Sequence, residues 1–208
     1  MLSRLRAGAT RVFTPIARLL LRMGVSPDAV TVAGTIGVVV AALWLFPRGH
    51  LLAGALVIAV LALSDLVDGV MARASGRAGP WGAFLDSTLD RFGDAAIFSG
   101  LLLFLHDRGE TVGAALALLC LVLGSIVPYA RARAEGLGMT ASVGIAERAD
   151  RLAVVLTASA VVGVGAPVRV LTVVLALLAV ASAVTVVQRM ATVRHQVREA
   201  CELGENRP

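Results

Sequence analysis

The chain has 208 residues, of which 58% are hydrophobic and 4% aromatic, and its net charge is +5. A mean hydropathy of +0.85 excludes an ordinary soluble domain. All 19 basic residues are Arg, and in so apolar a chain this charge favours anionic lipid over nucleic acid as the partner. We therefore expect an all-α polytopic membrane protein without a nucleic-acid ligand.

The first 25 residues predict an amphipathic helix that lies in the membrane interface. Its basic face consists of Arg4, Arg11, Arg18 and Arg22, and its apolar face of Leu5, Ala9, Phe13, Ile16 and Leu20. Opposite faces of this kind are typical of a helix bound to anionic membrane lipid. Pro15 is expected to bend the helix.

Residues 26–190 predict one domain of six transmembrane helices, because a spanning helix needs about 20 mostly apolar residues. The spans are expected at about 27–46, 51–74, 81–106, 111–131, 151–164 and 168–188. The first has a clear beginning, since Ser26 is followed by a proline at the first helical position. Residues 191–208 are expected to form a polar cytoplasmic tail.

The arginines also predict the orientation in the membrane. The three short loops on one side contain one arginine each, Arg48, Arg108 and Arg169. Nearly all other arginines lie in segments on the opposite side. Because positively charged loops stay in the cytoplasm, the crowded side should be cytoplasmic. We expect a multi-pass protein of the cell membrane with both termini and the active site on the cytoplasmic face.

Four aspartates in the second and third spans predict a metal site. Asp65 and Asp68 are three residues apart and Asp86 and Asp90 four apart, so each pair shares a helix face. The two helices are consecutive and joined by a short loop, so their cytoplasmic ends can bring the pairs together. A carboxylate within a span costs about 2.5–3.5 kcal/mol, and four of them would also repel one another. Divalent cations resolve both problems, and oxygen ligands without His or Cys favour Mg²⁺ or Mn²⁺.

A small ion-coupled transporter is the alternative of another class, since intramembrane carboxylates also form ion pathways. The glycine, alanine and arginine positions around the aspartates favour an enzyme instead. Arg73, Arg77 and Arg91 flank the site and could supply further positive charge. Asp94, one turn deeper than Asp90, is expected to support the site or the helix packing.

The spacing around the aspartates resembles the signature of the CDP-alcohol phosphotransferase family, Asp-x2-Asp-Gly-x2-Ala-Arg-x8-Gly-x3-Asp-x3-Asp. It is matched at Asp65, Asp68, Gly69, Ala72, Arg73, Gly82, Asp86 and Asp90. The resemblance implies a metal-dependent transferase that joins a CDP-activated lipid to a polar alcohol and releases CMP. It also implies two metal ions, held by the four aspartates, and a homodimer.

The same resemblance implies individual roles at the site. Asp90 would complete the metal site and act as the general base that takes the proton of the acceptor hydroxyl. The residues implied to contact the CDP-lipid are Asp28, Ala29, Val30, Thr31, Gly69, Ala72, Arg73, Gly79 and Gly82.

The fourth loop bears on the acceptor alcohol. Residues 129–135, 144–152 and 187–189 resemble the actinobacterial phosphatidylinositol-phosphate synthases. That resemblance implies CDP-diacylglycerol as donor and inositol phosphate as acceptor, whose phosphate would be held by Arg131, Arg133, Arg148, Arg151 and Arg189. Pro128 and Arg131 stand where that group is expected to have a small hydroxyl residue and a lysine.

Two alternatives remain for this loop. The acceptor could be glycerol phosphate, as in a phosphatidylglycerophosphate synthase. The arginines could also be ordinary cytoplasmic positive charge without a ligand.

Overall fold

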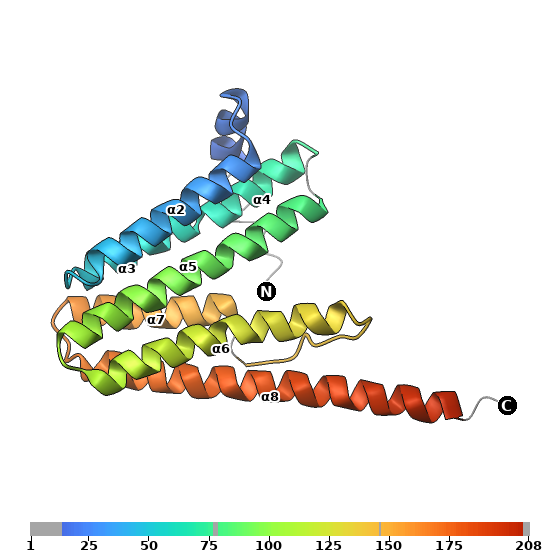
Figure 1. Ribbon diagram of the computed structural model, residues 1–208. Helices are drawn as coiled ribbons and strands as arrows, with labels where there is room; N and C mark the ends of the chain where they lie inside the picture. Colours follow the sequence, from blue (N-terminus) through green and yellow to red (C-terminus); the bar gives the residue numbers. More distant parts are fainter. Residues whose placement is uncertain (1–13, 77–78, 146, 206–208) are drawn as a thin grey trace. The chain divides into compact units, whose positions relative to one another are not determined.

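The computed structural model describes residues 14–76, 79–145 and 147–205, and the side chains of all these except residues 65, 66 and 201–205. Within these ranges all regular secondary structure is helical, which confirms the all-α prediction. After a helix at residues 14–22, the helices are α2 (Pro27–Leu45), α3 (Leu51–Ala62), α4 (Ser64–Ala74), α5 (Pro80–Asp107), α6 (Thr111–Glu135), α7 (Arg148–Gly163) and α8 (Arg169–Glu205) (Figure 1). The first half of the predicted interfacial helix, residues 1–13, lies outside the described residues.

The chain forms two compact units, Met1–Phe104 (unit 1) and Leu105–Pro208 (unit 2). In unit 1, α2 packs against α3 and α4. Small residues permit close packing, because a Cβ at Gly34 would collide with the Ser64 hydroxyl and one at Gly100 would collide with the Ala42 carbonyl. The helix at 14–22 is fastened by an apolar cluster, hereafter the α4 cluster, of Ala17, Val67, Val70 and Met71.

The predicted second span, 51–74, is divided into α3 and α4 at Leu63. The Leu63 N–H donates to the Val60 carbonyl at 3.2 Å, three residues back, and the Ser64 hydroxyl donates to the Leu61 carbonyl at 2.6 Å. This tighter turn ends the α-helical pattern of bonds between residues four apart. The stretch Leu51–Ala74 is still long and apolar enough to be the predicted span, but Asp65 and Asp68 belong to a short helix of their own within it.

In unit 2, α8 packs against both α6 and α7. It also holds the loop between α6 and α7. The Gln196 amide accepts a hydrogen bond from the Thr140 N–H at 3.0 Å and donates one to the Thr140 carbonyl at 2.7 Å. Nearer the N-terminus of α8, the Thr185 hydroxyl accepts from the Ile145 N–H at 3.2 Å. A glycine is required at 144, because its φ is +147° and a Cβ would collide with Thr185.

Among the described residues, four stretches are long and apolar enough to cross a membrane: Pro27–Leu45, Leu51–Ala74, Thr111–Glu135 and Arg169–Ala200. The predicted third span, in α5, is long enough but carries Asp86, Asp90, Arg91 and Asp94. The predicted fifth span corresponds to α7, which has only 16 residues. The count of six spans therefore stays a prediction, as do the boundaries at residues 25 and 190.

Candidate active site

A cavity of about 330 Å³ lies in unit 1, where the beginnings of α2 and α5 meet the C-terminal half of α4. It is lined by Pro27, Asp28, Thr31, Asp68, Gly69, Ala72, Arg73, Gly79, Gly82, Ala83 and Asp86. Most of these are residues that the sequence singled out. Pro27 and Ala83 were missed, although each adjoins a predicted site residue, Asp28 and Gly82. The cavity therefore gathers residues from three separate parts of the chain.

Asp68 is held at the cavity by α2. Its Oδ2 accepts a hydrogen bond of 2.5 Å from the Thr31 hydroxyl, whose oxygen also lies 3.1 Å from the Pro27 carbonyl. Only 8% of Asp68 is exposed. The orientation of this carboxylate is therefore fixed by a residue 37 positions away in the sequence.

Another side-chain hydrogen bond joins the beginning of α2 to the beginning of α5. The Trp81 indole N–H donates to Asp28 Oδ2 at 3.0 Å. The Trp81 ring also lies 6.1 Å from that of Phe84, centroid to centroid, in a tilted arrangement. Asp28 is thereby oriented at the cavity edge.

The glycines leave space on two sides of the cavity. A Cβ at Gly69 would lie 3.6 Å from Nη1 of Arg73, so the guanidinium lies over this glycine. No other part of the described protein would come within 4 Å of a Cβ at Gly79 or Gly82. Helix packing therefore does not require glycine at 82, and the space beside it is open to a ligand.

The predicted metal ligands are only partly brought together. Asp68 and Asp86 line the same cavity, whereas Asp90 does not line it and has its Oδ2 3.7 Å from Nη2 of Arg91. The backbone of Asp65 lies in α4, but its side chain is outside those described. Among the described side chains, no three acidic, histidine or cysteine groups are arranged to hold a metal ion. Convergence of all four aspartates stays a prediction.

The cavity nevertheless has a donor set that fits a hard divalent cation. Asp68 and Asp86 supply carboxylate oxygens, Asp28 adds a third carboxylate, and the described lining residues include neither His nor Cys. Mg²⁺ is usually held by one or two carboxylates together with phosphate oxygens of a substrate, and seldom by a complete protein cage. The pair Asp68 and Asp86 in this cavity fits that mode of binding.

Several other predicted residues lie elsewhere in unit 1. Ala29 and Val30 do not line the cavity, and Val30 packs against the α4 cluster. Asp94 is buried, in keeping with its expected supporting place. Arg77 lies outside the described residues.

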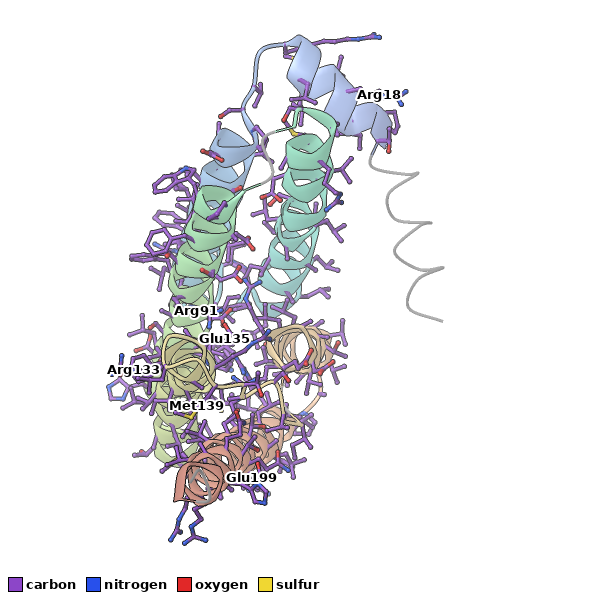
Figure 2. The ribbon with its side chains drawn as sticks, turned by 90° about the vertical axis from the view of Figure 1, so that its right-hand side faces the viewer. Arg18, Arg91, Arg133, Glu135, Met139 and Glu199 are labelled. Carbon is purple, nitrogen blue, oxygen red and sulfur yellow. The ribbon has the colours of Figure 1, made fainter. Side chains whose placement is uncertain are left out.

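The five arginines predicted to hold an acceptor phosphate all belong to unit 2. Arg133 and Glu135 lie near the C-terminal end of α6 (Figure 2). Arg131 and Arg133 are both exposed, and Arg131 Nε pairs with Glu135 Oε1 at 2.8 Å. Arg148 begins α7 and is half-buried. Arg151 and Arg189 are buried, with 2% and 6% of their surface exposed.

The two buried arginines bind backbone carbonyls of α6 and of the loop after it. Arg151 Nη2 donates to the Gly124 carbonyl at 3.3 Å. Arg189 donates through Nε to the Val143 carbonyl at 3.0 Å and through Nη1 to the Val127 carbonyl. The sequence indicated the charge of these residues but not their burial or their carbonyl partners.

The family model of the CDP-alcohol phosphatidyltransferases matches residues 24–185. The chain belongs to this family. The phosphatidylinositol phosphate synthase of Cutibacterium acnes is 50% identical over 97% of this chain and 100% of that protein. The synthase of the same name from Streptomyces avermitilis is 48% identical over 94% of this chain and 83% of its own.

Two crystal structures of the Mycobacterium tuberculosis phosphatidylinositol phosphate synthase have the same fold. The one with CDP-DAG bound has a TM-score of 0.84 and 45% identity, covering 88% of this chain and 94% of that one. The one in complex with manganese and citrate has a TM-score of 0.82 and 44% identity, covering 87% and 88%.

Family membership decides several predictions. The resemblance found in the sequence is confirmed, and so is an all-α, multi-pass membrane protein. The protein is a transferase and not the ion-coupled transporter considered as an alternative. Use of a divalent metal in the family is supported by the manganese complex. The identity and number of the metal ions in this protein stay predictions.

Proposed function

We propose that this protein transfers the phosphatidyl group of CDP-diacylglycerol to inositol phosphate, giving phosphatidylinositol phosphate and CMP. The observation that carries the proposal is the cavity of unit 1, which combines three carboxylates, an arginine and three glycines. Such a lining suits a metal-bound diphosphate with a nucleotide against the glycines. The names of the two relatives described above, both phosphatidylinositol phosphate synthases, support the choice of substrates.

The donor would bind through its diphosphate and its nucleotide. Arg73, over Gly69, is placed to pair with a phosphate oxygen. The first two turns of α2 also line the cavity, through Pro27, Asp28 and Thr31, and the N-terminal end of a helix favours an anion. The open space at Gly79 and Gly82 would receive the nucleotide.

Asp65, Asp68, Asp86 and Asp90 would hold two ions of Mg²⁺ or Mn²⁺. When bound, these ions would neutralise the diphosphate and stabilise CMP as the leaving group. Thr31 would keep the Asp68 carboxylate turned toward the cavity by the 2.5 Å hydrogen bond.

Asp90 would act as the general base. Its carboxylate would take the proton from the acceptor hydroxyl, whose oxygen forms a bond to the lipid-side phosphorus while the bond from that phosphorus to CMP breaks. Arg91, 3.7 Å away, would balance the charge of Asp90. Phosphoryl-type transfer depends mainly on positioning and electrostatics, so these residues would suffice without covalent catalysis by the protein.

The acceptor phosphate would be bound by the arginines of unit 2, Arg131, Arg133, Arg148, Arg151 and Arg189. Arginine suits this task because its planar fork of donors matches phosphate oxygens. We further propose six spans, a cytoplasmic active site and cytoplasmic termini, on the distribution of arginines among the loops. A homodimer is proposed on the sequence resemblance to the family.

An acceptor screen tests the proposed reaction. The purified protein in detergent is given CDP-diacylglycerol and Mg²⁺, and CMP release is measured with inositol phosphate, glycerol phosphate, or neither. Release only with inositol phosphate supports the proposal, and chelation with EDTA should abolish it. Release only with glycerol phosphate would establish the other acceptor, and no release with any alcohol would contradict the proposed activity.

Gly82→Ala should weaken donor binding without harming the fold. A Cβ at 82 meets no part of the described protein within 4 Å, and alanine favours a helix over glycine by up to about 1 kcal/mol. We expect thermal stability in detergent to stay equal or rise, while KM for CDP-diacylglycerol rises about tenfold, as for the loss of one good contact.

Gly93→Ala is the matched control on the same helix. Its Cβ would lie in ordinary contact with Val38, at 3.6 Å from Cγ1, and Gly93 does not line the cavity. Its KM should equal that of the wild type. If Gly82→Ala also keeps the wild-type KM, the space at Gly82 is not used by the donor.

A further inference from the structure

Pro128 lies inside α6, which runs without interruption from Thr111 to Glu135. Proline has no backbone N–H, so the carbonyl four residues earlier, that of Gly124, has no helical donor. In a membrane-spanning helix an unsatisfied carbonyl is strongly unfavourable, and such a proline is tolerated where a neighbouring helix supplies a partner. α6 therefore needs a hydrogen-bond donor from outside itself at Gly124.

Arg151 of α7 supplies that donor. Its Nη2 lies 3.3 Å from the Gly124 carbonyl, and only 2% of the residue is exposed. A Cβ at 124 would lie 3.7 Å from Nη2 and 3.8 Å from Nε, so the guanidinium lies against the helix at this glycine. This bond gives the Gly124 carbonyl a donor in place of the N–H that Pro128 lacks. It also gives one N–H group of the buried Arg151 guanidinium an acceptor.

A second buried arginine reaches the same part of α6. Arg189 of α8 donates through Nη1 to the carbonyl of Val127, the residue before Pro128. The two buried guanidinium groups of the predicted phosphate site are thus both fastened to backbone within four residues of the proline. Neither attachment point is a side chain, so each depends on the course of the α6 backbone.

We infer that Pro128 is a positioning residue for acceptor recognition: it keeps the Gly124 carbonyl available, and that carbonyl orients Arg151 for the phosphate of the acceptor. The inference rests on the proposed function, in which Arg151 is one of the phosphate ligands. A guanidinium is planar and carries its donors in a fixed fork, so one bond to a rigid carbonyl limits the plane in which the other donors lie.

The test replaces Pro128 by alanine. The new N–H at 128 can donate to the Gly124 carbonyl, as in a regular helix, and it then competes with Arg151. We expect KM for inositol phosphate to rise about tenfold, the equivalent of one hydrogen bond to a charged group. The kcat and KM for CDP-diacylglycerol should stay within about twofold of wild type, because unit 1 is unchanged.

Pro167→Ala is the matched control, since it makes the same replacement in unit 2 at a proline that lies between α7 and α8, outside any helix. Because no helix runs through position 167, the new N–H does not restore a hydrogen bond within a helix. The variant should therefore have the wild-type KM for both substrates. If Pro128 acts only on the fold, Pro128→Ala will change thermal stability but leave the KM for inositol phosphate unaltered. That result would overturn the inference.

A double-mutant cycle decides whether Pro128 acts through Arg151. Arg151→Lys keeps the positive charge but lacks the planar fork, and in that background Pro128→Ala should have little further effect on inositol phosphate binding. Binding is measured by calorimetry with inositol phosphate, so the cycle does not depend on turnover. Independent, multiplicative effects of the two changes would contradict the inference. A wild-type protein that turns over no inositol phosphate would instead contradict the proposed function.

Discussion

Asp90→Asn is expected to abolish turnover while CDP-diacylglycerol still binds. Asparagine has nearly the same size and keeps one oxygen, but it cannot take the proton of the acceptor hydroxyl. General-base catalysis contributes about 10²–10⁴-fold, and loss of a charged metal ligand would add to this. Asp90 does not line the cavity that we assign to the donor, so donor affinity should change much less than kcat. Single-turnover CMP release and equilibrium binding of CDP-diacylglycerol measure the two effects separately.

Asp107→Asn is the matched control for this change. Asp107 ends α5, the helix that carries Asp90, and it is exposed and far from the cavity in sequence. Its turnover should equal that of the wild type. Near-normal activity of Asp90→Asn would show that another group removes the proton.

Many residues that line the cavity lie at spacings that follow from helix geometry. Asp68, Gly69, Ala72 and Arg73 lie within two turns of one helix, and Asp86 follows Gly82 by one turn. Side chains three or four residues apart share a face, and consecutive helices pack side by side. Residues of α4 and of the beginning of α5 supply most of the lining, and α2 supplies the rest.

The break between α3 and α4 could not be predicted in the same way. Residues 51–63 are uniformly apolar with a single Gly54, and no proline marks the turn at Leu63. The break accompanies close packing with α2, where Gly34 lies against Ser64. It depends on a tertiary contact 30 residues away in the sequence, which local propensity does not contain.

The long-range hydrogen bonds of the site show the same limit. The bonds from Thr31 to Asp68 and from Trp81 to Asp28 join residues that no local pattern relates. Pro128 is different, because a proline within an apolar helix does signal a carbonyl without its helical donor at Gly124. That signal could have been found in the sequence, whereas the identity of the arginine that donates to this carbonyl could not.

Asp68→Asn is expected to weaken metal and nucleotide binding together. The carboxylate is nearly buried, at 8% exposure, and Thr31 holds it at the cavity. Asparagine can still accept the hydrogen bond from Thr31 but removes the negative charge. Changes to groups that only support a metal ligand cost about 10–100-fold in affinity, so loss of a ligand should cost at least about 100-fold. Manganese affinity in the presence and absence of CDP-diacylglycerol, and the Kd of the donor, measure both losses.

Thr31→Val provides the graded comparison for Asp68→Asn. It removes the 2.5 Å hydrogen bond while the charge of Asp68 remains, so manganese affinity should fall by only about 10-fold. If Asp68 is a metal ligand and Thr31 supports it, metal affinity should decrease from the wild type to Thr31→Val and again to Asp68→Asn. Unchanged metal affinity in Asp68→Asn would remove this carboxylate from the metal site. An equal loss in both variants would instead mean that the bond between α2 and α4, and not the charge, is what the site requires.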